Sequence, residues 1–227
     1  MNGIVEAFVG SPSVVEEPVA TEVAPVRTGS LTGPSLHDEQ IRSLVQHLFF
    51  RPSEPEYRHV AFTTADPQTE IARMCLSIAR VLCGHGRHNI AVIDASLEAT
   101  PLNLRMGTSG ARGDGTWELE TRLWLVSREE WLEDDPAGAV SSESLIRLQA
   151  VSKQFDFSLL CCDPMSSLPA RIGRVSDGLV LVLTASKTRR LAAVKIRQQL
   201  RAAGVPLLGT VLASRPFPVP AALYRKL

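Results

Sequence analysis

Five short segments of the chain are almost continuously apolar, and segments with helical periodicity separate them. A strand that is apolar along its whole length has both faces buried, which is typical of parallel sheets covered by helices. The sequence therefore predicts an α/β fold with a doubly wound, mostly parallel sheet and helices on both faces. The expected central strands cover residues 60–64, 90–94, 157–162, 179–184 and 207–212.

The sequence predicts one domain preceded by a tail. Residues 1–35 are rich in Pro, Val, Glu, Ser and Gly and show no periodicity, which is typical of a disordered tail or linker. Residues 36–227 then form the folded domain, which starts with an amphipathic helix over residues 38–50. A chain of 227 residues with 44% hydrophobic content can bury one core of this size.

Charge and composition argue against several classes of function. Basic and acidic residues balance at 24 each, which gives the whole chain no attraction to nucleic acid or anionic lipid. No apolar run approaches the roughly 20 residues that span a bilayer, and the N-terminus lacks the pattern of a secretory signal. We therefore expect a cytoplasmic protein without direct membrane insertion. The four cysteines and five histidines show no metal-ligand spacing, so no metal site is expected.

Residues 60–79, VAFTTADPQTEIARMCLSIA, have the layout of a strand, a phosphate-binding loop and a helix. A working phosphate loop reads G-x-x-x-x-G-K-[ST]. Its backbone N–H groups surround the phosphates, its Lys reaches their oxygens, and its hydroxyl holds Mg²⁺. The vestigial phosphate-loop positions of this chain are, in order, Pro67, Gln68, Thr69, Glu70, Ile71 and Ala72.

Four of these residues remove the phosphate chemistry. Gln68 and Glu70 stand at glycine positions, while Ile71 stands at the Lys position and Ala72 at the hydroxyl position. The lost cation and the added carboxylate both oppose a triphosphate, each by about 4 kcal/mol for unit charges about 4 Å apart. We therefore expect no cofactor, with Mg-ATP bound weakly at most. The alternative is an ordinary strand, turn and helix that never bound a ligand.

Beyond this segment, the chain resembles the cytoplasmic domain of the bacterial tyrosine autokinases of capsule and exopolysaccharide synthesis. These kinases belong to the P-loop ATPases with a deviant Walker motif. The resemblance rests on IAVIDAS at 90–96, FDFSLLCCDP at 155–164, SDGLVLVLTASKTRR at 176–190 and the ending from residue 209. It implies a P-loop NTPase-like domain that is a degenerate member of the group.

The resemblance implies roles for a few residues. Asp94 matches the acid that acts on Mg²⁺ and on the attacking hydroxyl. Cys161 stands where the Walker B strand has its metal-side Asp, and Asp163 lies two positions later. Asp94 and Asp163 are therefore the residual catalytic candidates. Tyr224 is a possible phosphoacceptor, and packing of this ring against the domain is the alternative.

The resemblance also implies an interface. Glu39 and Arg42 match the first two members of a Glu-x-x-Arg-x-x-Arg pattern that serves oligomerisation in the family, and Val45 replaces the third. The implied partners are a membrane-embedded polysaccharide chain-length (co-polymerase) protein or an active kinase paralogue, in a homo- or hetero-oligomer. Such a partner would hold the protein peripherally at the inner membrane. The alternative is that this helix packs only on its own domain.

Three functions remain open from the sequence. The first is a pseudoenzyme that acts as an interaction or regulatory subunit in exopolysaccharide or capsule synthesis and export. The second is an active ATP-dependent tyrosine kinase or ATPase with a rebuilt nucleotide site, for which Arg73 is the nearest replacement cation. The third is a partitioning or site-selecting ATPase of the same fold, which would also need the missing Lys.

Overall fold

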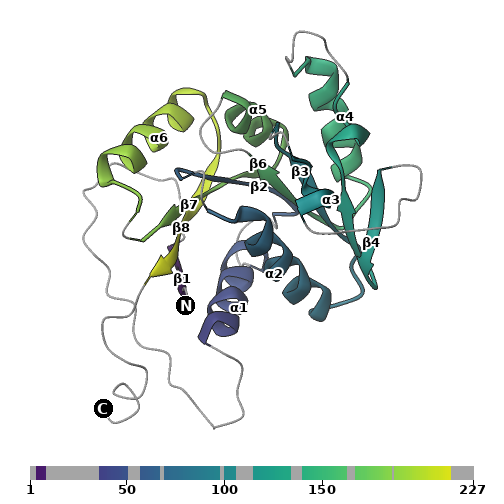
Figure 1. Ribbon diagram of the computed structural model, residues 1–227, viewed down its shortest axis with the longest axis horizontal. Coiled ribbons are helices and arrows are strands. Elements are labelled where there is room, and N and C mark those ends of the chain that lie inside the picture. The colour runs from purple at the N-terminus through teal and green to yellow at the C-terminus, as the bar shows by residue number, and fades with distance from the viewer. Residues whose placement is uncertain are drawn as a thin grey trace.

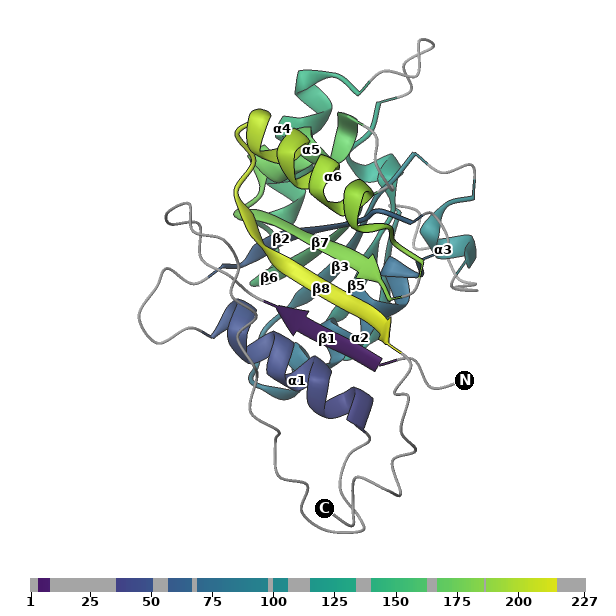
Figure 2. The same ribbon diagram turned by 90° about the vertical axis from the view of Figure 1, so that its left-hand side faces the viewer.

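The computed structural model describes residues 4–8, 36–50, 57–66, 69–97, 100–105, 115–133, 140–162, 167–185 and 187–215. These residues form one eight-stranded sheet with helices on both faces (Figure 1, Figure 2). In chain order, the elements are β1 (Ile4–Phe8), α1 (Leu36–Phe49), β2 (His59–Thr64), α2 (Ile71–Gly84), β3 (Ile90–Ala95), α3 (Leu102–Arg105), β4 (Thr116–Glu120), β5 (Leu123–Val126), the 3₁₀ turn η1 (Arg128–Glu130), α4 (Ser142–Ser152), β6 (Phe157–Cys162), α5 (Ser167–Val175), β7 (Gly178–Thr184), α6 (Arg190–Ala202) and β8 (Leu207–Arg215).

The strand order of the sheet is β1-β8-β7-β2-β6-β3-β5-β4. The strands from β8 to β5 in this order pair in parallel, whereas the outer strands β1 and β4 pair antiparallel with their neighbours. The predicted doubly wound, mostly parallel sheet is therefore confirmed. Each predicted central strand falls within one of β2, β3, β6, β7 and β8.

Two apolar cores lie on opposite faces of the sheet. Successive side chains of a strand point to opposite faces, so Phe62 and Leu159 pack with the buried residues of α1 and α2. Their strand neighbours Ala61 and Leu160 pack with those of α4, α5 and α6. Both faces of the central strands are thus buried, which explains why their sequences are continuously apolar.

The strand β1 corrects the tail prediction. The sequence predicts a disordered tail over residues 1–35, but β1 pairs antiparallel with β8, with Phe8 opposite Thr210. For residues 4–8 the prediction is therefore wrong, since an edge strand is stabilised by hydrogen bonds to its neighbour as well as by its own sequence pattern. Figure 2 shows β1 between β8 and α1, where it covers a sheet edge that would otherwise expose unpaired backbone groups.

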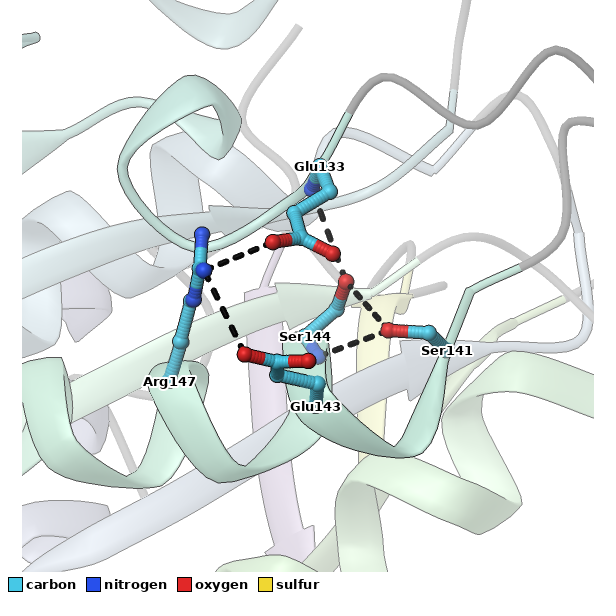
Figure 3. Close-up of polar contacts among 5 residues, drawn as sticks. All are labelled: Glu133, Ser141, Glu143, Ser144 and Arg147. Carbon is cyan, nitrogen blue, oxygen red and sulfur yellow. Dashed lines mark hydrogen bonds and ion pairs between the residues drawn. The ribbon is translucent and has the colours of Figure 1, made fainter.

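The helices follow the apolar spacing of the sequence. The buried residues of α2 recur at helical intervals along the face that contacts the sheet. The first turn of α4 is capped by Ser141, whose Oγ accepts the backbone N–H of Ser144 at 2.9 Å (Figure 3). Among the described residues, no helix is both long enough and apolar enough to span a membrane.

Candidate functional site

The carboxyl ends of the parallel strands meet at one edge of the sheet, and β2 lies where the direction of winding changes. After β2 the chain passes through α2 to β3 on one side, and after β6 it crosses through α5 to β7 on the other side. In open α/β sheets, ligands bind beyond the carboxyl ends of the strands at such a switch point. The loop between β2 and α2 therefore occupies the position where a ligand site is expected.

The described part of this loop uses its backbone N–H groups internally. The N–H of Asp66 donates to Thr64 Oγ1 at 3.1 Å. The N–H of Thr69 donates to the carbonyl of Asp66 at 3.0 Å, and that of Ile71 to the carbonyl of Thr69 at 2.9 Å. A phosphate loop works by directing such groups at the phosphate oxygens. These three donors are already satisfied by the loop itself.

The hydroxyl of Thr69 ties the loop to the end of β7. Its Oγ1 lies 2.5 Å from Oγ1 of Thr184, which is the last residue of β7 and is buried. The N–H of Thr184 in turn donates to Thr188 Oγ1 at 2.9 Å. Hydroxyl groups at this edge therefore bind one another and close the turn after β7.

The residues at the Lys and hydroxyl positions also belong to the fold. Ile71 is only 6% exposed and packs in the core under α2. Ala72 is partly buried against the same core. Arg73, the candidate replacement cation, forms an ion pair with Glu70 at 3.1 Å on the helix surface, where both side chains are exposed. No cation from this stretch of α2 is directed at the site among the described contacts.

Asp94 is fully buried at the end of β3, and both of its carboxylate oxygens accept hydrogen bonds from the protein. Oδ1 accepts the hydroxyl of Ser96 at 2.7 Å and its backbone N–H at 3.2 Å. Oδ2 accepts the backbone N–H of Leu102, the first residue of α3, at 2.8 Å. The carbonyl of Asp94 accepts the indole N–H of Trp131, which is also fully buried, at 2.9 Å. The carboxylate of Asp94 therefore holds the segment that follows β3, and its backbone carbonyl holds the segment that follows β5.

Cys161 lies within the core. It is paired in register with Asp94 on β3 and packs on the α2 side of the sheet. Burial raises the pKa of the neighbouring Cys75 thiol well above its usual range, and a hydrogen bond with Cys161 adds to this effect. Cys75 therefore does not offer the thiolate that binds a metal, and Cys161 is a buried side chain of the same core.

Four of the predicted site residues, Pro67, Gln68, Asp163 and Tyr224, lie outside the described residues. Within the described ranges, no three His, Cys, Asp or Glu side chains come together so that they could hold a metal ion.

Two further acids have structural roles that the sequence analysis missed. At the amino ends of the strands, Asp177 accepts the N–H groups of Arg58 and His59, each at 2.7 Å. Asp156 accepts the N–H of Asn89 at 2.7 Å. Each acid directly precedes a strand: Asp177 precedes β7 and Asp156 precedes β6. That position is the only signal in the sequence for these contacts.

The predicted interface helix, α1, divides into a buried and an exposed side. The apolar stripe packs into the domain core, and Val45 within it is fully buried. Arg42 is exposed and Glu39 is half-buried. The third position of the oligomerisation pattern therefore contributes to the core, and the other two positions remain at the surface.

No family model matches the chain, and no curated protein matches it. Solved structures do match. The chimerical protein CapA2B2 has a TM-score of 0.68 at 15% identity, over 81% of this chain and 87% of that chain. The kinase domain of the Escherichia coli tyrosine kinase ETK has a TM-score of 0.67 at 19% identity, over 87% and 86%. A ParA family ATPase from Chlorobium tepidum has a TM-score of 0.55 at 12% identity, over 68% and 72%.

The chain has the fold of the P-loop ATPases. This confirms the predicted fold and its likeness to bacterial tyrosine kinase domains. Identities of this size show a shared fold, so the chemistry has to be judged from the site itself. The described residues fit Mg-ATP poorly. Both oxygens of Asp94 accept hydrogen bonds within the protein, Cys161 is a buried core thiol, and the N–H groups of Asp66, Thr69 and Ile71 donate to oxygen atoms of the loop itself.

Proposed function

We propose that the protein is a catalytically degenerate relative of the bacterial tyrosine kinase domains. It acts as an interaction or regulatory subunit in the synthesis and export of an exopolysaccharide or capsule. It works in the cytoplasm, held at the inner membrane through a partner. The fold shared with the ETK kinase domain supports the kinase-like origin. The observation that carries the loss of catalysis is that both oxygens of the buried Asp94 carboxylate accept hydrogen bonds from within the protein.

The energetic argument starts from what phosphoryl transfer needs. Catalysis of this kind consists of positioned cations and a metal ion that neutralise the developing charge. Magnesium binds through carboxylate oxygens in a strict octahedral geometry. Both oxygens of Asp94 already accept hydrogen bonds from N–H or O–H donors of the protein, and a metal that displaced one of these donors would leave it unpaired. An unpaired buried donor costs about 1–3 kcal/mol. Metal binding at this carboxylate is therefore opposed by the fold.

The alternative is an active kinase with a rebuilt site. It depends on Arg73, which would have to leave Glu70 and point toward the carboxyl ends of the strands. The exposed ion pair itself is weak, since exposed pairs contribute about 0.2–1 kcal/mol. The stronger obstacle is again that both oxygens of Asp94 already accept hydrogen bonds within the protein, which is why the inactive form is preferred.

Thermal unfolding with and without Mg-ATP tests the proposal. A ligand present at a hundred times its dissociation constant stabilises a protein by about 2.7 kcal/mol, which is easily seen as a rise in Tm. We expect no rise, and no phosphotyrosine after incubation with Mg-ATP. The kinase domain of ETK serves as the positive control. A rise in Tm together with phosphotyrosine formation would establish the active alternative.

The interaction role is proposed to use the exposed side of α1. Glu39 and Arg42 remain at the surface while the apolar stripe of the helix is consumed by the core. With Val45 in place of the second Arg, we expect a weaker homo-oligomer or a hetero-oligomer. The partner would be the cytoplasmic segment of a membrane-embedded co-polymerase or an active kinase paralogue.

The double variant Glu39→Ala/Arg42→Ala tests this interface by light scattering in the presence of that partner segment. We expect association to be lost while Tm stays within a few degrees of the wild type. The matched control is Glu143→Ala/Arg147→Ala, an exposed pair on α4 at the other face. Unchanged association in the first variant would move the interface away from α1, and a collapsed Tm would give these residues a purely structural role.

A further inference from the structure

The zero net charge of the chain hides a strong segregation of charge. Residues 178–227 contain nine Lys or Arg residues and no Asp or Glu. Residues 1–177 therefore carry 15 basic and 24 acidic residues. Most of the basic residues in the C-terminal part that the structure describes lie on α6 or in the turn before it. Figure 1 shows α6 at the end of the molecule opposite β4 and α4.

The helix α6 is attached to the domain by a narrow contact. Its buried residues are Ile196 and Leu200, out of 13 in the helix. By comparison, α2 has 14 residues and buries six of them. Most of the α6 sequence is therefore not determined by packing against the sheet, and its surface is available to solvent.

The exposed surface of α6 carries a basic stripe. Arg190, Arg197 and Arg201 are spaced by seven and four residues, which places them on one side of the helix over roughly 16 Å. Arg189, directly before the helix, is exposed, and Lys195 is exposed on another side of the helix. Within the described part of the chain, none of these five side chains forms an ion pair or a side-chain hydrogen bond. Their charges are uncompensated by neighbours.

Several exposed arginines elsewhere on the molecule have acidic partners. Arg147 on α4 bridges Glu133 at 2.6 Å and Glu143 at 3.5 Å (Figure 3). Arg80 on α2 pairs with Glu120 at 2.7 Å. Single exposed arginines without an ion pair, such as Arg42 and Arg174, also occur elsewhere among the described residues. What distinguishes α6 is that several such basic side chains lie together on one helix.

An apolar side chain accompanies the basic stripe. Leu191, in the first turn of α6, is 84% exposed, more than any other large apolar side chain in the described residues. It adjoins Arg190 in sequence and lies one helical turn before Lys195, so basic side chains flank it. A basic helix face with a projecting apolar side chain is typical of helices that lie on membrane surfaces.

We propose that the exposed face of α6 docks on an anionic lipid bilayer. The bilayer offers a plane of phosphates to the arginines and, just below it, an apolar layer to Leu191. Nucleic acid would satisfy the arginines but leave Leu191 in water. The acidic residues at the far end of the sheet do not cancel the attraction, because charges beyond about 8 Å are screened at physiological salt. This docking is independent of any nucleotide chemistry.

Vesicle sedimentation with the full chain tests the proposal. We expect binding to vesicles of phosphatidylcholine mixed with phosphatidylglycerol, no binding to phosphatidylcholine alone, and weakening by salt. Each basic residue near such a surface is worth roughly fivefold in partition. Arg190→Gln/Arg197→Gln/Arg201→Gln should therefore bind about 100-fold less, and Leu191→Ala about tenfold less.

The matched control is Arg73→Gln/Arg80→Gln/Arg147→Gln, which removes the same number of charges from other surfaces and should bind as the wild type does. The proposal is overturned if the wild type does not sediment with the phosphatidylglycerol vesicles, or if the stripe variant and the control bind equally. Binding to a short DNA duplex without binding to these vesicles would also overturn it, in favour of nucleic acid. Thermal melting of each variant confirms that it is folded.

Discussion

The two ends of the parallel strands differ in burial but use their acids in the same way. At the amino ends, Asp177 is exposed and Asp156 is half-buried, and each holds backbone N–H groups that begin a neighbouring strand. At the carboxyl ends, Asp94 is fully buried and holds the start of α3 and both donors of Ser96. An acid kept for a ligand would be expected to retain an open oxygen.

At both edges of the sheet, the acids accept hydrogen bonds from the protein's own N–H or O–H groups. The proposed loss of nucleotide binding implies that these acids serve only the fold. If that is right, removing these acids should cost folding stability in proportion to burial and to the number of donors left unpaired. We therefore expect the largest loss of stability for the most buried acid, which accepts the most hydrogen bonds.

The largest effect is expected for Asp94→Ala. This variant leaves three buried donors without an acceptor, so the free energy of unfolding should fall by roughly 3 to 5 kcal/mol. Urea unfolding followed by circular dichroism measures the change. Asp94→Asn retains one acceptor oxygen and should lose less. Unchanged or increased stability in Asp94→Ala would mean that the acid is kept for a ligand. It would contradict the view that the acids at both edges of the sheet serve the fold.

A smaller effect is expected at the amino ends. Asp177→Ala removes the acceptor of two backbone donors that water can reach, which should lower the free energy of unfolding by roughly 1 to 2 kcal/mol. Asp156→Ala removes the acceptor of one backbone donor, the N–H of Asn89, and should cost about half as much. The same urea experiment measures both variants. A loss at Asp177 equal to that at Asp94 would show that burial does not set the cost.

The smallest effect is a pH dependence near Asp177. Burial lowers the pKa of His59 below its ordinary value of 6.5, and the nearby Asp177 opposes part of this shift. The unfolded chain therefore takes up the proton first as pH falls below that value. Stability is retained above the unfolded pKa and is lost as pH falls through the folded pKa.

Thermal melting at several pH values between about 7.5 and 5 checks this dependence. We expect the Tm of the wild type to fall over this range more than that of His59→Asn. Asparagine is chosen because it keeps a polar group near Ser158, whose Oγ lies 3.0 Å from His59 Nδ1. If the Tm of the two proteins falls equally with pH, His59 does not cause the pH dependence. A steeper fall in the variant would contradict the sign of the shift.

The sequence predicts the sheet well and the use of the site poorly, for physical reasons. Buried parallel strands need continuous apolar runs, so β2, β3, β6, β7 and β8 can be read directly. The strand β1 is short and lies among Pro- and Gly-rich residues, and its partner is about 200 residues away. Nothing local marks it.

The prediction of a changed phosphate loop rests on the fixed spacing of the motif, and it stays a prediction. The hydrogen bonds of Asp94 could not be predicted from the sequence. They depend on the fold, which places the N–H of Leu102, eight residues later, against Oδ2 of Asp94. The same limit applies to Asp177, whose partners at Arg58 and His59 are more than 100 residues away in the sequence. Contacts of this range follow from the fold and have no sequence pattern of their own.

Isothermal titration calorimetry of the full chain with Mg-ATP tests the central claim most directly, with the ETK kinase domain as the positive control. Both oxygens of Asp94 accept hydrogen bonds within the protein, and the described loop N–H groups donate to oxygen atoms of the loop. We therefore expect no saturable heat at micromolar to low millimolar nucleotide. A saturable isotherm with a micromolar or tighter Kd would contradict it and show that this edge of the sheet still serves a nucleotide.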